Sequence, residues 1–293
     1  MGATLALLVA GCSTPGDRDG GGGDGLRIIA SFSAIEFVAE RVAGEDAQVT
    51  NLTPPGADPH ALELSGARIA ELHEADLVVY LSGLQAATDD AVSLLDDVPV
   101  LDTAEATEVE IAGERETGEW PDPGLDPHFW LDPLRLAWAG HDVADALAEV
   151  DPDRAEEYRA RAEELDEELV ELDREYAEAL APCTGDTVVT SHEAFGYLAA
   201  RYNLNQVGIS GVDPEVEPSP ARLREVTSVV EDTGVRTVFF EVNASRRVAE
   251  RLADELGVGT DVLDPMERPS EADYMAVMRS NLDALARGLV CAG

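Results

Sequence analysis

Short runs of β-branched and apolar residues alternate with longer segments of helical period from residue 27 onward. This alternation is typical of parallel sheets whose strands are connected by crossover helices. In the first half, strands are expected at 27–31, 48–52, 76–81 and 98–101, and helices at 65–74 and from Pro133 to about residue 149. After Pro182, strands are expected at 187–190, 206–209, 237–241 and 260–263, and helices at 194–201, 220–233, 246–256 and 271–289. The pattern predicts an α/β protein of two lobes, each with a parallel four-stranded sheet flanked by helices.

The segment between these two sets of strands has a different pattern. It opens at Asp151 and Pro152 and continues to Leu180 without a glycine or an internal proline. Its apolar residues recur at steps of three or four and define one face of a helix; they are Tyr158, Ala162, Leu165, Leu169, Leu172, Tyr176 and Leu180. A coiled-coil dimer is the alternative, but the stripe is short and its heptad positions are mixed. We therefore expect one long rigid helix at 151–181, which joins a lobe at 26–150 to a lobe at 182–293.

Acidic residues dominate the charge. The 293 residues include 60 Asp and Glu against 20 Lys and Arg, for a net charge of −40, and all the Lys and Arg positions are arginine. A surface this negative repels nucleic acids and anionic lipid headgroups, which argues against DNA or RNA binding. It concentrates divalent cations nearby, but adaptation to solubility or high salt explains the same composition. With 45% hydrophobic residues, the chain is expected to be globular.

The first residues have the pattern of a targeting segment. A run of small and apolar residues at 3–11 is too short to span a bilayer and is followed directly by Cys12. This resembles the lipobox of bacterial lipoproteins, in which Cys12 would carry the lipid, although a chance cysteine in an apolar leader is the alternative. A positively charged start is missing, so we expect a truncated or misassigned start. Residues 1–12 are thus interpreted as signal peptide and 13–25 as a flexible Gly-rich tether.

Cys183 and Cys291 remain as an even pair. Outside the cytoplasm such a pair is more often oxidised than free, and loop closure depends only weakly on sequence separation. We expect a disulfide between them, with two buried thiols as the alternative.

Three of the five histidines lie where a strand or loop gives way to the next element. His60 follows a predicted strand in a Pro-rich turn, His128 ends an acidic loop, and His192 directly follows a strand. Asp264 follows a strand in the same way. Ligands in open parallel sheets collect outside the carboxyl ends of the strands, so these four side chains are expected between the lobes. Three imidazoles and a carboxylate suit tetrahedral Zn²⁺ better than Mg²⁺, Ca²⁺ or Mn²⁺.

The other two histidines, His73 and His141, lie within predicted helices and are interpreted as surface or packing residues. Spacing alone leaves the metal site open, because no HExxH or CxxC pair is present and ligands this far apart in sequence need not meet.

Longer motifs carry a family resemblance. The chain has Pro-Gly-Ala-Asp-Pro-His at 55–60, Asp-Pro-His-Phe-Trp-Leu-Asp-Pro at 126–133, Ser-His-Glu-Ala-Phe-Gly-Tyr-Leu-Ala at 191–199 and Pro-Glu-Val-Glu-Pro-Ser at 214–219. Phe-Phe-Glu at 239–241 and Leu-Asp-Pro at 263–265 follow in order. From about residue 26 to its end, the chain resembles the zinc and manganese solute-binding proteins of ABC importers.

The resemblance implies two lobes linked by one rigid helix, with the metal between them and no catalysis. It implies metal-ligand roles for His60, His128, His192 and Asp264. Manganese members of the family have a carboxylate at the position of His192, so this histidine points to zinc. The resemblance also implies an extracytoplasmic, lipid-anchored monomer that passes zinc to a permease and its ATPase. The loop at 102–126 departs from many zinc members because it contains carboxylates and no histidine.

Three other functions stay open on the sequence. One is a manganese-binding member of the same fold, and another is an adhesin, which fold alone does not distinguish from a transporter. The third is a zinc hydrolase with Glu241 or Glu193 as the base. A fourth protein ligand disfavours it, because catalytic zinc usually keeps one position for water.

Overall fold

The computed structural model describes residues 25–45, 47–104, 126–214, 216–241, 246–270, 272–289 and 291. Cys12, the expected tether and residues 105–125 of the acidic loop lie outside the described residues. No helix in the described part is both long and apolar enough to cross a bilayer.

The two sheets have the same strand order and are entirely parallel. The first, in the order β2-β1-β3-β4, contains β1 (Leu26–Ala30), β2 (Ala47–Asn51), β3 (Leu77–Tyr80) and β4 (Val100–Asp102). The second, in the order β6-β5-β7-β8, contains β5 (Thr187–Thr190), β6 (Asn205–Gly208), β7 (Thr237–Glu241) and β8 (Gly259–Leu263). The predicted fold class, with two four-stranded parallel sheets, is confirmed.

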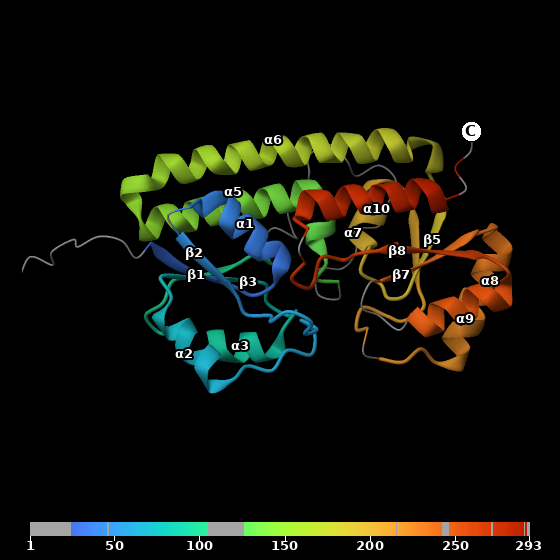
Figure 1. The fold of residues 1–293 in the computed structure, drawn as a ribbon, viewed down its shortest axis with the longest axis horizontal. Coiled ribbons are helices and arrows are strands. Elements are labelled where there is room, and N and C mark those ends of the chain that lie inside the picture. Colours follow the sequence, from blue (N-terminus) through green and yellow to red (C-terminus); the bar gives the residue numbers. More distant parts are fainter. Residues whose placement is uncertain are drawn as a thin grey trace, which may run out of the picture.

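Helices flank both sheets (Figure 1). Those of the first half are α1 (Ser33–Ala43), α2 (Gly66–Glu74), α3 (Ala86–Val92) and α5 (Pro133–Val150). Those of the second half are α7 (Gly196–Arg201), α8 (Pro220–Thr233), α9 (Arg246–Leu256) and α10 (Tyr274–Gly288). Short 3₁₀ turns lie at η1 (Phe129–Leu131), η2 (Pro152–Arg154) and η3 (Ala181–Cys183).

Capping chemistry sets several of the helix boundaries. Asp132 accepts a hydrogen bond from the Leu134 amide and precedes Pro133, so α5 begins there. The last helix, α10, begins three residues later than predicted, because Asp273 caps it by accepting from the Ala276 amide.

The long helix α6 (Ala155–Leu180) extends across the top of both sheets in Figure 1. Its buried residues are the seven that the sequence pattern predicts, from Tyr158 to Leu180. They face α5 and α1 on one side of the molecule and α10 on the other. Tyr176 also donates a hydrogen bond to the carbonyl of Met278 in α10, at 2.6 Å. One helix thus joins the two halves; the domain limits at residues 150 and 182 stay a prediction.

The hydrophobic core is shared between the halves. One continuous cluster includes α1 and α5 residues, the buried stripe of α6, and residues of β5, α7 and α10. Two smaller clusters lie on the other faces of the sheets. One packs β1 and β3 against α2, and the other packs β5 and β7 against α8 and α9. Burial along α6 therefore stabilises the two halves together rather than each one separately.

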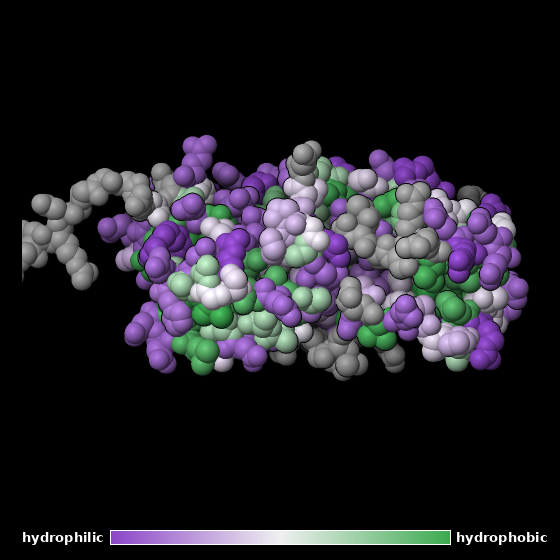
Figure 2. All heavy atoms as spheres, turned by 60° about the horizontal axis from the view of Figure 1, so that its bottom comes forward, coloured by the Kyte–Doolittle hydropathy of each residue, from purple (hydrophilic) through white to green (hydrophobic). Residues whose placement is uncertain are grey.

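Cys183 at η3 and Cys291 after α10 form a disulfide, with their Cα atoms 4.1 Å apart. The predicted bridge is confirmed, and it ties the end of the chain to the start of the second half. The surface seen in Figure 2 is mainly hydrophilic with small hydrophobic patches, as the acidic composition leads one to expect.

Candidate metal site

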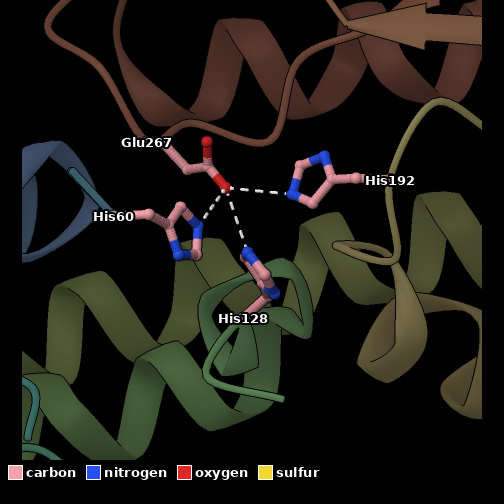
Figure 3. Close-up of side chains that lie close together, drawn as sticks. All are labelled: His60, His128, His192 and Glu267. Carbon is pink, nitrogen blue, oxygen red and sulfur yellow. Dashed lines mark hydrogen bonds and ion pairs between the residues drawn. The ribbon is translucent and has the colours of Figure 1, made fainter. Parts of the chain in front are cut away.

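Three imidazoles converge on one carboxylate between the two halves of the molecule (Figure 3). The Nε2 atoms of His60, His128 and His192 lie 3.3, 3.0 and 3.3 Å from Oε1 of Glu267. Each of the four residues has a possible ligand atom, and these four atoms all lie within 4.8 Å of one another. The four residues come from four segments: the loops after β2, β5 and β8, and the turn before η1.

His128 is completely buried and is oriented by Asp126. One oxygen of Asp126 accepts hydrogen bonds from the backbone amide and from Nδ1 of His128, at 2.9 and 2.7 Å. Asp126 thereby keeps a proton on Nδ1, so a metal that displaces the Nε2 proton would meet a lone pair directed at the centre of the site.

His192 is oriented in the same way by Glu241, the last residue of β7. Glu241 accepts from Nδ1 of His192 at 2.5 Å and from its backbone amide at 3.2 Å. Its Oε1 also accepts from the Ser191 hydroxyl at 2.9 Å. These bonds occupy Glu241 as the support of a histidine, so it does not join the four converging groups.

His60 has a looser setting. It lies in the loop that follows β2, and its side chain is 11% exposed, whereas those of His128 and His192 are 0% and 1% exposed. Its backbone amide donates to Oδ1 of Asp58 at 3.0 Å. The loop conformation therefore determines where the His60 ring lies.

The turn after β8 presents Glu267. Asp264 accepts a hydrogen bond from the Met266 amide at 2.9 Å, and Met266 has a left-handed backbone with φ of 56°. Asn281 of α10 holds the backbone of Asp264 through bonds of 2.8 and 2.7 Å. The turn is also tied to η1, because the Trp130 indole donates to the carbonyl of Pro265 at 2.6 Å.

Among the sequence-predicted residues, the structure brings together His60, His128 and His192 and leaves Asp264 outside the group. Glu267 takes the fourth place, and sequence reasoning missed it. The signal that could have found it is a second carboxylate three residues after Asp264, still in the loop that ends β8. His73 is exposed on α2, and His141 on α5 lies 3.6 Å from Asp166; neither joins the group.

The charges of the site stabilise one another. Burial raises the pKa of the Glu267 carboxyl, but hydrogen bonds from the three histidines outweigh this and hold that pKa well below its usual range. Burial lowers the pKa of His192, but its bonds to Glu241 and Glu267 raise it to about 10. The pKa of His128 is also raised, because Asp126 and Glu267 outweigh its burial. The site thus favours the protonated imidazoles of His128 and His192 beside the ionised Glu267 carboxylate.

A cavity of about 430 Å³ opens beside the cluster. Its lining includes His192 and Glu267 from the cluster, and Asp58, Glu217, Asp264 and Arg268 around it. The lining contains five acidic side chains and one arginine, so the space beside the site carries net negative charge, a suitable approach for a cation.

By fold and site chemistry, this is a two-lobed α/β protein with a nitrogen-rich metal site between its halves. Residues 28–288 match the family model described as the zinc-uptake complex component A, periplasmic. The chain is 31% identical to the high-affinity zinc uptake system protein ZnuA of Bacillus subtilis, over 98% of this chain and 96% of that protein. The chain belongs to this family.

Two further similarities agree with this assignment. The zinc-binding lipoprotein AdcA of Streptococcus pneumoniae is 36% identical over 97% of this chain, and the chain spans 59% of the length of AdcA. The crystal structure of the Zn(II)-bound ZnuA-like domain of that AdcA is 34% identical, with a TM-score of 0.75, covering 90% of this chain and 99% of that domain.

Proposed function

We propose that this protein captures Zn²⁺ between its two lobes and delivers it to an ABC importer. The observation that carries the proposal is the convergence of three Nε2 atoms on Glu267. A tetrahedral zinc with bonds of roughly 2.0–2.2 Å needs ligand atoms roughly 3.4 Å from one another. The three distances to Glu267 Oε1, 3.0–3.3 Å, are close to that requirement.

In this proposal the ligands are His60, His128, His192 and Glu267. Asp264, the fourth ligand suggested by the family resemblance, instead forms the turn that presents Glu267. Three nitrogen donors favour zinc over manganese, because Mn²⁺ prefers oxygen ligands. Carboxylates that hold Nδ1 of two of the histidines are the usual support of a zinc-bound imidazole.

Transport fits the site better than hydrolysis. Four side-chain ligands complete a tetrahedron and leave no position for an activated water. The two carboxylates considered as a base from the sequence have other partners. Glu241 supports His192, and Glu193 pairs with Arg222 at 2.6 Å.

The names of its relatives support a proposal for the partners and location of the protein. We infer an extracytoplasmic monomer, anchored through lipid on Cys12, that passes zinc to a permease driven by an ATPase. A relative named as a zinc-binding lipoprotein and another named as part of a zinc uptake system support this inference. The disulfide Cys183–Cys291 suits an oxidising compartment.

The function is tested by elemental analysis and zinc titration of the purified protein. We expect one zinc per chain and a higher melting temperature with zinc than with manganese. At a free zinc concentration 100 times the dissociation constant, stabilisation is about 2.7 kcal/mol. Equal shifts with both metals, or none, would count against zinc as the cargo.

The choice between the two carboxylates needs its own pair of variants. Glu267→Ala removes the proposed ligand, whereas Asp264→Asn keeps an oxygen for the Met266 amide. Zinc affinity should fall much further in Glu267→Ala. The reverse order would restore Asp264 as the ligand.

A further inference from the structure

One carboxylate links the most exposed of the four proposed ligands to the opposite lobe. Oδ1 of Asp58 accepts from the backbone amide of His60 at 3.0 Å. Its other oxygen, Oδ2, accepts from the guanidinium of Arg268, the residue directly after Glu267. Asp58 therefore contacts the segments that carry two of the proposed ligands, one from each half of the molecule.

This ion pair is more sheltered than the surface pairs. The side chains of Asp58 and Arg268 are 12% and 19% exposed, whereas Arg287 and Asp261, a pair within the second half, are 61% and 27% exposed. Screening by water and salt is weaker for the sheltered pair, so its contribution is larger. Within the described part of the chain, Arg268 forms its ion pair with Asp58. The Nε atom of Arg268 has no hydrogen-bond partner among the described residues.

Both partners line the cavity beside the site. Separation of the His60 loop from the Glu267 turn, which release of the metal requires, would break this ion pair. His128 and His192 have carboxylate supports within their own halves, through Asp126 and Glu241. The imidazole of His60 has no carboxylate support in its own half, and its loop is joined to the opposite lobe through Asp58 and Arg268.

We propose that the Asp58–Arg268 ion pair is a positioning device that holds the His60 loop against the Glu267 turn and sets the rate of zinc release. This rests on the proposed function, because it presumes that zinc is the cargo. The pair forms only when the two segments meet, so it slows dissociation and leaves association nearly unchanged.

The test is a stopped-flow measurement of zinc transfer to a chromogenic chelator. Asp58→Asn keeps an oxygen for the His60 amide and loses the charge, and Arg268→Gln removes the other partner. Each should release zinc about tenfold faster, which corresponds to roughly 1.4 kcal/mol. The double variant should be no faster than the faster single variant, because the two residues act through one interaction. Arg268→Lys, which keeps the charge without the planar fork, should fall between wild type and Arg268→Gln.

Arg287→Gln is the matched control, since it removes an arginine from an ion pair that does not cross between the lobes. Its release rate should equal that of the wild type, and melting curves of all variants without added zinc check that they fold. Wild-type release in Arg268→Gln, additive effects in the double variant, or an equal rise in Arg287→Gln would overturn the inference while leaving zinc binding intact. A wild-type chain that binds no zinc would overturn the proposed function as well.

Discussion

His128 and His192 lie in settings that differ sharply from that of His60. The first two are buried, and each has a carboxylate on Nδ1, Asp126 or Glu241. His60 is partly exposed in a loop and is held through its backbone amide. Two of the proposed ligands are thus oriented in the absence of metal, and the position of the third depends on the conformation of its loop. The site therefore has two parts. His128 and His192, each held by a carboxylate, form a fixed frame. His60, whose position is set by its loop, forms an adjustable arm.

Removal of a ligand should have the largest effect. His192→Ala should weaken zinc binding beyond the 10–100-fold range typical of a lost supporting partner. His60→Ala should cost less than His192→Ala, because it leaves both histidines that are oriented by a carboxylate, His128 and His192. Calorimetric or competition titrations measure both, with His141→Ala on α5 as the control. A loss at His141 similar to that at His192 would show that the wrong residues were chosen.

Lowering the pH should have the second-largest effect on zinc affinity. Bonds to Glu241 and Glu267 raise the pKa of His192 to about 10, so zinc must displace a proton from this imidazole at neutral pH. Because the pKa of His192 is raised, its proton competes with zinc more strongly as the pH falls. The apparent affinity for zinc should drop about tenfold per pH unit for each proton that zinc displaces. Chelator competition between pH 7.5 and 5.5 tests this. Affinity that stays flat over this range would contradict ligation by the histidines.

Loss of a supporting carboxylate should come third. Glu241→Gln and Asp126→Asn should each lower zinc affinity about 10- to 100-fold, because the imidazole loses its preferred tautomer and orientation. Glu193→Gln, next to His192 in sequence but paired with Arg222, is the control. No change in Glu241→Gln would mean that His192 is held by packing alone.

The smallest effect should appear in local dynamics. Amides at 54–62 should exchange with solvent faster than those of β5 and His192, and zinc should protect the first group more. Hydrogen–deuterium exchange with and without zinc provides the comparison. Equal protection of both segments would remove the distinction between frame and arm.

The sequence predicts regular, amphipathic elements well and irregular ones poorly. The buried stripe of α6 could be read from spacing alone, because each member packs on one helical face. The helices α1 and α3 were not predicted. Most of α1 is buried, its polar face is limited to Glu36, Glu40 and Arg41, and its N-terminus has no side-chain cap as a start signal. The helix α3 has only seven residues.

The candidate site shows the same limit. The three histidines can be recognised in the sequence because they directly follow predicted strands or loops. Glu267 instead reaches the site through a turn in which Met266 has a left-handed backbone conformation. Methionine carries no sequence signal for that conformation, which glycine or asparagine usually adopts. Asp264 directly follows the strand and therefore looked like the ligand.

The most direct test of the site is anomalous diffraction at the zinc absorption edge from crystals of the zinc-loaded protein. We predict a single strong peak between the lobes, at roughly 2.0–2.2 Å from Nε2 of His60, His128 and His192 and from a carboxylate oxygen of Glu267. A peak bound by Asp264 instead of Glu267, or one located away from the three histidines, would contradict the account.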